Sequence, residues 1–228
     1  MSRDSSGSAE DTTGSEESPS LPAGVTYQEF GEDSNARLAT RGTPVYGERT
    51  EGEWRLWGSR RSKVGAMYEK GLDLRLEGGE KVLYLGAASG TTASHVADFS
   101  HALYAVEFAA RPVRDLVGVA KGRPNLFPLL KDARKPASYA HVVEPVDALI
   151  QDVATRGQAG VARANRRFLA DDGVLIMAIK ARSEDVTRDP ADVFESVLAD
   201  LCEDYEVLDT ERLEPFHDDH LAVVARPR

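Results

Sequence analysis

The sequence predicts an α/β protein with a doubly wound, mostly parallel sheet. From residue 81 onward, short apolar runs typical of buried strands alternate with segments of helical spacing. Such alternation favours a parallel sheet with helices on both faces. The last two apolar runs break the pattern, because only a loop that includes residues 212–219 joins them. Two strands joined in this way are expected to be antiparallel neighbours.

Seven apolar runs supply the strands of this sheet, at residues 82–85, 102–106, 126–130, 146–150, 174–179, 205–208 and 220–224. The clearest helix is predicted for residues 190–202, where Asp189 is a natural N-cap and Pro190 suits the first helical position. Another helix is predicted for residues 62–70, before the first strand. Seven strands that end in an antiparallel hairpin form the Rossmann-like sheet of class I methyltransferases, and this is the fold that we expect.

The N-terminal part of the chain differs in composition. Residues 1–20 are mostly Ser, Gly, Thr, Asp and Glu, so they cannot bury enough apolar surface to fold alone. Short β-prone pieces follow at 25–27, 37–40 and 43–47, separated by Gly, Pro, Asn and Asp. We therefore predict a disordered acidic tail (1–23), a small N-terminal antiparallel β domain (24–57) and the main α/β domain (58–228).

The charge of the chain is strongly negative but unevenly distributed. The formal net charge is −10, and eight acidic residues lie within residues 1–34 against a single arginine. Net negative charge ordinarily argues against nucleic acid binding. Here basic residues cluster locally and arginine outnumbers lysine, a composition that resembles the proteins of salt-loving organisms. The acidity then serves solubility and does not exclude a nucleic acid partner.

Other features disfavour several classes of protein. No apolar segment is long enough to span a membrane and the start lacks the apolar core of a signal peptide, so we expect a soluble, cytoplasmic protein. The single cysteine, Cys202, excludes an internal disulfide and a multi-cysteine zinc site, and we expect its thiol to be buried. The five histidines are scattered and predict no metal site.

The first predicted strand runs into a turn of small residues and then into a helix. Gly86 and Gly90 lack a Cβ atom, so backbone N–H groups of this turn can approach a nucleotide-like ligand. The Gly-x-x-x-Gly spacing differs from the Gly-x-Gly-x-x-Gly of dinucleotide sites and favours a cofactor without a diphosphate, such as S-adenosylmethionine. An ordinary tight turn with small residues for packing fits the same spacing.

Polar residues end the next four strands, at the sheet edge where such folds bind ligands. Glu107 lies twenty-one residues after the first glycine of the turn, which suits a carboxylate that binds the ribose hydroxyls of a cofactor. Asp132 is a candidate acceptor for an adenine amino group, and Gln151 and Asp152 end the fourth strand. Lys180 ends the fifth, where a carboxylate such as Asp152 can tune its proton affinity. Solvated strand ends, or a structural ion pair at Lys180, are the alternatives.

Residues 53–63 combine both tryptophans of the chain with four basic residues. Aromatic rings among basic side chains suit a groove that holds a phosphodiester backbone. A linker whose tryptophans cover the core and whose cations are solvated fits equally well. His220, which opens the last strand near the same sheet edge, is a candidate for positioning a substrate, or else a histidine without chemistry.

Motifs spread over residues 37–228 are together similar to those of the fibrillarin family of RNA 2′-O-methyltransferases, in an archaeal and halophilic version. They are TPVYGE (43–48), EWRLW (53–57), RRSK (60–63), YLGAASGTT (84–92), YAVEF (104–108), DAR (132–134), QDVA (151–154), IKAR (179–182) and DH (219–220). The resemblance implies a Lys-Asp-Lys-His set at the active site, which corresponds to Lys63, Asp152, Lys180 and His220.

The resemblance also implies a cofactor, a substrate and partners. The cofactor is S-adenosylmethionine, held by Gly86, Ala87, Thr91, Thr92, Glu107, Phe108, Asp132, Ala133 and Asp152, with Gln151 near its methionine end. The implied activity is 2′-O-methylation of ribose in rRNA or tRNA, guided by box C/D RNA together with a Nop-domain scaffold protein and a kink-turn-binding ribosomal-type protein. A methyltransferase for a small molecule or a protein, and a catalytically silent assembly subunit, are the rival expectations.

Overall fold

The computed structural model describes residues 20–228, and the predicted disordered tail lies, up to residue 19, outside the described residues. In chain order its elements are β1 (Val25–Phe30), β2 (Asp33–Arg41), β3 (Thr50–Glu51), β4 (Trp54–Leu56), η1 (Ser59–Arg61), α1 (Lys63–Glu69), β5 (Lys81–Leu85), α2 (Thr91–Ala97), β6 (Ala102–Glu107), α3 (Ala110–Ala120), β7 (Leu126–Leu130), η2 (Pro136–Ser138), β8 (Val146–Gln151), α4 (Gln158–Asn165), η3 (Arg166–Phe168), β9 (Leu169–Lys180), α5 (Ala181–Glu184), α6 (Pro190–Leu201), β10 (Tyr205–Arg212) and β11 (His220–Pro227).

The main sheet has seven strands in the order β10-β11-β9-β8-β5-β6-β7. Strands β5 to β9 pair in parallel, whereas β11 is antiparallel to both β9 and β10. The predicted class I methyltransferase sheet, including its antiparallel last pair, is confirmed. The strand order reverses between β5 and β8, and in open α/β sheets ligands bind beyond the carboxyl ends of the strands at such a point.

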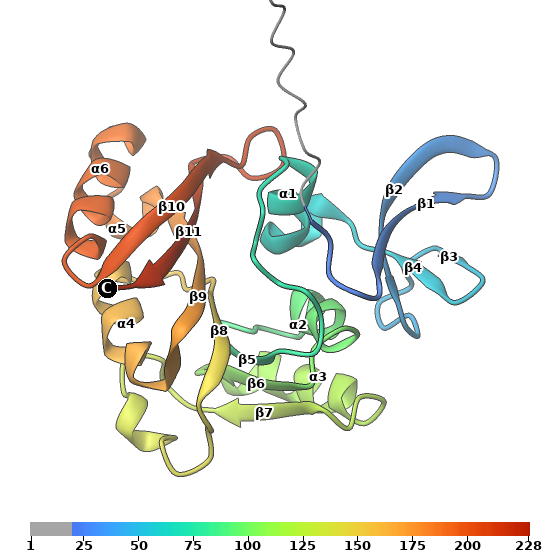
Figure 1. The fold of residues 1–228 in the computed structure, drawn as a ribbon, viewed down its shortest axis with the longest axis horizontal. Helices are drawn as coiled ribbons and strands as arrows, with labels where there is room; N and C mark the ends of the chain where they lie inside the picture. Colours follow the sequence, from blue (N-terminus) through green and yellow to red (C-terminus); the bar gives the residue numbers. More distant parts are fainter. Residues whose placement is uncertain (1–19) are drawn as a thin grey trace, which may run out of the picture.

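Helices cover both faces of the main sheet. Figure 1 shows α4, α5 and α6 on one side of it and α1, α2 and α3 on the other. Because successive residues of a strand point to opposite faces, β5 contributes Val82 and Tyr84 to one buried cluster and Leu83 and Leu85 to the other. This burial on both faces explains why the strands are short apolar runs in the sequence.

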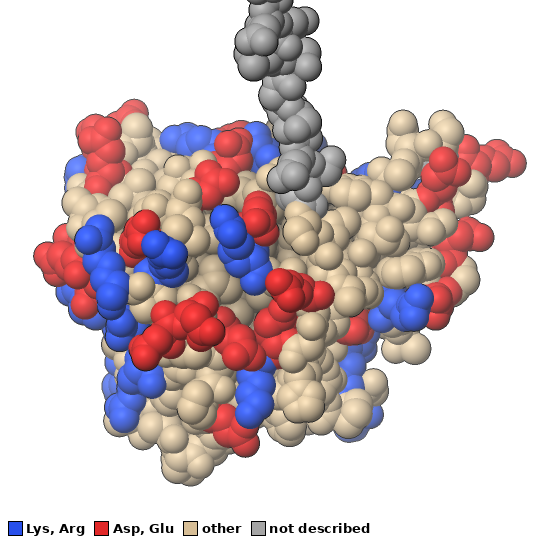
Figure 2. All heavy atoms as spheres, in the orientation of Figure 1, with Lys and Arg blue, Asp and Glu red and all other residues tan. Residues whose placement is uncertain are grey.

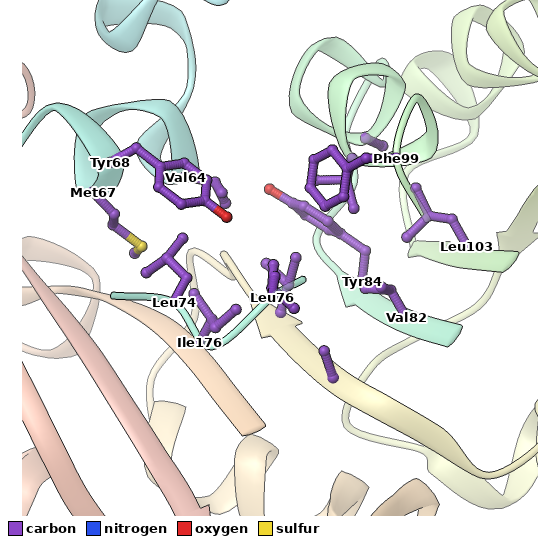
Figure 3. Close-up of a cluster of buried hydrophobic side chains, with 14 of the residues drawn as sticks. Val64, Met67, Tyr68, Leu74, Leu76, Val82, Tyr84, Phe99, Leu103 and Ile176 are labelled. Carbon is purple, nitrogen blue, oxygen red and sulfur yellow. The ribbon is translucent and has the colours of Figure 1, made fainter. Parts of the chain in front are cut away.

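The segment between α1 and β5 ties this first helix to the sheet. Leu72, Leu74 and Leu76 of the segment are at most 2% exposed. Figure 3 shows Leu74 and Leu76 between Met67 and Tyr68 of α1 and the strands of the sheet. The helix begins where the Ser62 hydroxyl accepts a hydrogen bond from the Gly65 N–H (3.1 Å). The same hydroxyl accepts a hydrogen bond from Thr92 near the start of α2 (3.1 Å), which fixes the N-terminal end of α1 next to that helix.

The N-terminal sheet is antiparallel, with the order β1-β2-β4-β3. The expected strand residues 25–27 and 37–40 lie in β1 and β2, but the strand expected at 43–47 is wrong. The Glu48 carboxylate accepts hydrogen bonds from the backbone N–H groups of Val45 (2.7 Å) and Tyr46 (2.9 Å). A side chain therefore takes the hydrogen bonds that a neighbouring strand would otherwise make, and the segment forms a loop.

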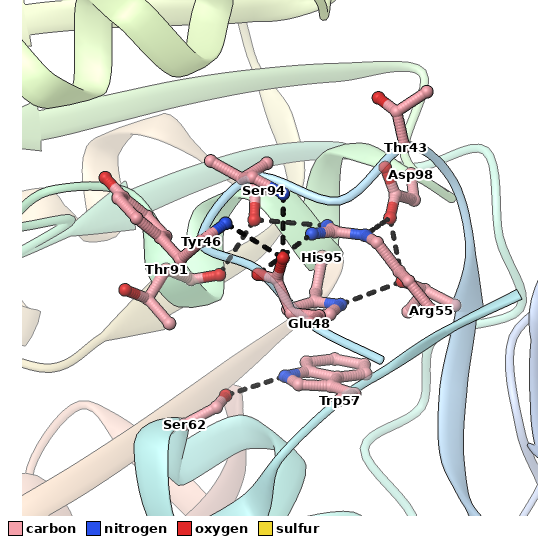
Figure 4. Close-up of polar contacts among 12 residues, drawn as sticks. Thr43, Tyr46, Glu48, Arg55, Trp57, Ser62, Thr91, Ser94, His95 and Asp98 are labelled. Carbon is pink, nitrogen blue, oxygen red and sulfur yellow. Dashed lines mark hydrogen bonds and ion pairs between the residues drawn. The ribbon is translucent and has the colours of Figure 1, made fainter. Parts of the chain in front are cut away.

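A buried polar network joins the N-terminal sheet to α2 of the main domain (Figure 4). The Arg55 side chain is fully buried and donates to Asp98 (2.8 Å) and Ser94 (3.1 Å), and it lies 3.4 Å from Glu48. A second guanidinium, from Arg123, lies 3.0 Å from the other oxygen of Asp98. These pairs supply the opposite charge that a buried arginine requires.

Trp57 lies next to this network and is 1% exposed. Its ring stacks on His95 (centroids 5.1 Å apart), and its N–H donates to the Ser62 hydroxyl (2.9 Å). The idea that residues 53–63 form an aromatic and basic groove for a phosphodiester backbone is therefore wrong for Arg55 and Trp57. For Trp57 the alternative holds, because this tryptophan covers the core; Arg55 is paired inside the protein.

Helix α6 confirms its predicted start and apolar face. The Asp189 side chain accepts a hydrogen bond from the Ala191 N–H, and Val193, Val197 and Leu201 are among its buried residues. The expected burial of Cys202 is wrong, because this residue is exposed at the end of the helix. One residue further along a helix turns the side chain by about 100°, which takes Cys202 away from the buried face of Leu201.

The surface carries both signs of charge. Figure 2 shows acidic and basic side chains interspersed over this face of the main domain, with acidic side chains at the outer end of the N-terminal sheet. This face of the molecule lacks a continuous basic surface. Among residues 20–228, no helix is long and apolar enough to cross a membrane.

Candidate functional site

A pocket of about 440 Å³ opens at the carboxyl ends of β5, β6, β7 and β8. Its volume lies in the range of roughly 300–1,000 Å³ that is usual for small-ligand sites. The pocket is lined by residues predicted for the cofactor, namely Gly86, Glu107, Phe108, Asp132, Ala133 and Asp152, and in addition by Ala88, Val106, Lys131, Arg134, Val153, Ala154, Thr155 and Val161.

The turn after β5 brings two strand ends into contact at Gly86. This glycine has a φ of +85°, and a Cβ atom added to it would lie 2.2 Å from the carbonyl oxygen of Asp152. Ala88 also has a positive φ (47°), which is uncommon for a residue with a side chain and is typical of ligand sites. The glycine therefore serves packing and the turn also forms one wall of the pocket, so the two interpretations of its spacing are compatible.

Glu107 is held rigidly at the end of β6. Its side chain accepts hydrogen bonds from the backbone N–H groups of Ala88 (3.0 Å) and Ala109 (2.8 Å), one on each carboxylate oxygen. The residue is only 8% exposed, and it lines the pocket. Each oxygen has a further lone pair, so this fixed carboxylate can accept hydrogen bonds from a ligand with neighbouring hydroxyl groups.

The next two residues of the wall offer an aromatic ring and a second carboxylate. Phe108 is 73% exposed, which is unusual for a large apolar side chain and leaves its ring free to cover a flat ligand. Asp132 accepts hydrogen bonds from the backbone N–H (2.9 Å) and the guanidinium (3.0 and 2.8 Å) of Arg134. These hydrogen bonds from Arg134 hold the pKa of Asp132 below its usual value, so the group is an acceptor at neutral pH.

Lys63 and Asp152 form an ion pair beside the pocket. The Lys63 ammonium lies 2.8 Å from an Asp152 carboxylate oxygen, and the two side chains are 21% and 22% exposed. Lys63 is the first residue of α1, which Ser62 caps, and Asp152 directly follows β8. Two segments 89 residues apart in the chain are therefore brought together at the sheet edge.

Lys180 and His220 lie opposite each other on β9 and β11. We predicted Lys180 to lie near Asp152 of the neighbouring strand. Asp152 takes Lys63 as its partner, and none of the ion pairs found among residues 20–228 includes the ammonium of Lys180. A lysine that no carboxylate holds, at the carboxyl end of β9, is available to a substrate.

The imidazole of His220 has a defined orientation. Its Nδ1 atom lies 2.6 Å from the carbonyl oxygen of Asp218, and because a carbonyl only accepts, Nδ1 carries the hydrogen. The Nε2 atom is buried and has no partner in the described protein. Burial lowers the pKa of His220, and the nearby Lys63 lowers it further, so the neutral ring offers Nε2 as an acceptor.

His217 is a neighbour that we did not predict as part of the site. Its ring centroid is 5.8 Å from that of His220, and its Nε2 atom forms a hydrogen bond (2.8 Å) with the carbonyl oxygen of Ser59. Burial is the main cause that lowers the pKa of His217. The one signal for it in the sequence is its spacing from the next histidine, His217-x-x-His220. Within residues 20–228, no cluster of three or more residues that could bind a metal is present.

Some of the predicted cofactor residues lie outside the pocket wall. The Thr92 hydroxyl donates to Ser62 (3.1 Å), and the Thr91 carbonyl accepts from Ser94 (2.9 Å). Gln151 is 1% exposed and donates to the carbonyl oxygen of Gln158 (2.9 Å). Lys131, Arg134 and residues 153–155 line the pocket although we did not predict them as cofactor residues. They follow predicted strand ends, and Arg134 and residues 153–154 also lie in motifs of the family resemblance.

Comparisons with known proteins agree with this geometry. The chain matches the family model described as Fibrillarin over residues 22–228. It is 65% identical over 208 residues to the fibrillarin-like rRNA/tRNA 2′-O-methyltransferase of Haloarcula marismortui, with 91% of this chain and 98% of that protein covered.

Two solved structures are similar over nearly the whole described chain. A chain of a fibrillarin/Nop5p complex has a TM-score of 0.84 at 39% identity, with 91% of this chain and 99% of that chain covered. Aeropyrum pernix fibrillarin, solved in complex with natively bound S-adenosyl-L-methionine, has a TM-score of 0.78 at 42% identity, with coverage of 89% and 98%.

Proposed function

This chain belongs to the fibrillarin family, and we propose that it transfers a methyl group from S-adenosylmethionine to the ribose 2′-hydroxyl of rRNA or tRNA. The names of its haloarchaeal relatives support this activity. The observation that carries the proposal is the Lys63–Asp152 ion pair beside a pocket of cofactor size. A lysine and a neutral histidine, Lys180 and His220, lie on adjacent strands near the same edge.

The residues of the pocket fit S-adenosylmethionine. Glu107, fixed by two backbone N–H groups, would bind the ribose hydroxyls of the cofactor, and the exposed ring of Phe108 would cover the adenine. Asp132 and Ala133 would lie at the adenine edge, and the turn at Gly86 would lie under the amino acid part. When bound, this cofactor supplies a methyl group that its sulfonium already activates.

The active-site residues then have to align the ribose and stabilise charge. The Lys63 ammonium would hold the Asp152 carboxylate in one orientation, and His220 Nε2 would accept the hydrogen bond of a ribose hydroxyl. The 2′-oxygen would give its proton to His220 Nε2 as it attacks the methyl carbon, while the carbon–sulfur bond breaks and S-adenosylhomocysteine leaves. Lys180 would stabilise the negative charge that develops on this oxygen. Alignment and fixed charges of this kind are the main contributions expected of a protein in a displacement reaction.

Partners choose the target nucleotide in this proposal. The formal net charge of the chain is −10, which disfavours tight binding of an RNA backbone by this protein alone. We propose a box C/D guide RNA, a Nop-domain scaffold protein like the Nop5p of the solved complex and a kink-turn-binding ribosomal-type protein as partners. The proposed location is the cytoplasm.

Methylation of a guide-matched RNA by the assembled complex tests the proposal. Lys180→Ala should abolish methyl transfer and leave cofactor affinity, measured by calorimetric titration, near that of the wild type. Loss of cofactor affinity in this variant would contradict the roles assigned above. A silent assembly subunit would show neither cofactor binding nor methyl transfer in the wild type.

A further inference from the structure

We infer that Gln158 is a positioning residue for Lys180: its buried side-chain amide holds both backbone hydrogen-bonding groups of that lysine. Gln158 Oε1 accepts the Lys180 N–H at 3.0 Å, and Gln158 Nε2 donates to the Lys180 carbonyl oxygen at 3.0 Å. Gln158 is 0% exposed, although it is polar and begins α4. The inference rests on the proposed function, because it assumes that Lys180 acts in methyl transfer.

The hydrogen bonds from Gln158 are needed because β9 extends beyond the end of its neighbour β8. Strand β8 ends at Gln151, which pairs with Met177 of β9, but β9 continues to Lys180. The last residues of β9 therefore have no strand beside them on the β8 side. Unpaired backbone groups in a buried position are costly, and a primary amide carries the same donor and acceptor as a peptide group. The Gln158 side chain takes the place of the missing strand.

On its other side, the same end of β9 is held by β11. Lys180 lies opposite His220, and the Ala181 N–H donates to the Asp219 carbonyl oxygen at 3.0 Å. With Gln158, the backbone at Lys180 is fixed from both sides. The direction of the Lys180 Cα–Cβ bond, and with it the reach of the ammonium, is then set by the fold.

Two neighbours in turn fix Gln158. The Glu184 carboxylate accepts the backbone N–H groups of Gly157 (2.8 Å) and Gln158 (2.6 Å), where an acidic group also complements the helix dipole of α4. Gln151 donates to the Gln158 carbonyl oxygen (2.9 Å). Glu184 lies in α5, which directly follows Lys180. The segment that begins at Lys180 therefore holds Gln158 in place, and Gln158 in turn holds the backbone of Lys180.

Kinetics of the assembled complex can separate positioning from stability. Gln158→Ala and Gln158→Met remove both hydrogen bonds, and the second keeps much of the volume if the first folds poorly. A displacement of about 1 Å at a reacting group can cost about 100-fold in rate. We expect kcat to fall by about 10- to 100-fold, while cofactor affinity and the KM for RNA stay near wild type.

Gln158→Glu supplies a readout that a purely structural role would not move. The neutral carboxyl can still donate to the Lys180 carbonyl oxygen, whereas the ionised form repels it. The rate of this variant relative to wild type should therefore rise as the pH is lowered, and the relative rate of Gln158→Met should not change. Asn125→Ala is the matched control, since Asn125 also donates to two backbone carbonyls (2.8 and 2.9 Å) but lies away from the site.

Lys180→Ala, measured beside these variants, distinguishes the two levels of the proposal. Loss of activity in Lys180→Ala together with wild-type kcat in the Gln158 variants would overturn the positioning role alone. A lower melting temperature with unchanged kcat would overturn it as well. Wild-type activity in Lys180→Ala would refute the proposed role of the lysine, and the inference with it.

Discussion

Gly86→Ala is the substitution whose outcome the structure defines best. An added Cβ atom would lie 2.2 Å from the Asp152 carbonyl oxygen, and the backbone has a φ of +85° that disfavours any side chain. The left-handed conformation costs about 1–2 kcal/mol. Overpacking against backbone adds about 1–3 kcal/mol. We therefore expect the free energy of unfolding to fall by about 2–5 kcal/mol, which corresponds to about 4–20 °C in melting temperature.

Relief of this clash has a consequence for activity. Asp152 must move away from β5 by about 1 Å to restore a normal contact, and its carboxylate is the partner of Lys63. A shift of this size at a reacting group is expected to lower kcat by about 100-fold. Thermal and urea unfolding, together with methylation by the assembled complex, measure the two effects in the same preparation.

Gly52→Ala provides the matched control. Gly52 also has a positive φ (+57°), but nothing lies within 4 Å of a Cβ atom added there. It should lose only the conformational part, about 1–2 kcal/mol, and keep full activity. If the two variants showed the same stability and the same rate, the reasoning about close approach at Gly86 would be refuted.

Asp152→Asn removes the charge opposite Lys63 at nearly constant volume; kcat should fall by about 100-fold with cofactor affinity retained in calorimetry, and an unchanged kcat would count against the role of this pair. Asp98→Asn leaves Arg55 buried without its main opposite charge, so urea titration should show a loss of about 3–5 kcal/mol, whereas Glu53→Gln, in an exposed pair with Arg41, should lose less than about 1 kcal/mol. Burial, with Arg55 and Arg123 nearby, lowers the pKa of His95 well below its usual 6.5, so the unfolded chain binds protons more readily and stability should fall as the pH drops below 6.5. Unfolding in urea on both sides of that pH should show a smaller drop for His95→Gln; an equal drop would place its cause elsewhere.

The main sheet was predictable because its strands carry their own signal. Runs such as 82–85 and 148–150 are buried on both faces, so their apolar character does not depend on distant residues. The antiparallel last pair followed from the lack of a helix before His220. The loop at 43–47 was missed because a single side chain, Glu48, takes the hydrogen bonds of a β-prone segment.

The site was less predictable because its contacts join distant segments. Glu107 ends β6 and Asp152 directly follows β8. Because ligands of such sheets bind beyond the carboxyl ends of the strands, these positions are sufficient to place both residues near the pocket. The family resemblance, and not spacing, placed Lys63 and Asp152 in one site across 89 residues. Their direct pairing was not predicted, because Lys180 was the expected neighbour of Asp152. The burial of Arg55 depends on Asp98 of another element, and nothing near Arg55 in the sequence indicates it.

Methyl transfer to a target RNA with a 2′-deoxy sugar at the guide-matched position tests the central claim most directly. The assembled complex should methylate the ribose form of this RNA at that single nucleotide and leave the deoxy form unmodified, while cofactor binding is the same in both experiments. Equal methyl incorporation into the two RNAs, or into a protein component of the complex, would contradict the claim that the pocket beside Lys63, Asp152 and Lys180 serves a ribose 2′-hydroxyl.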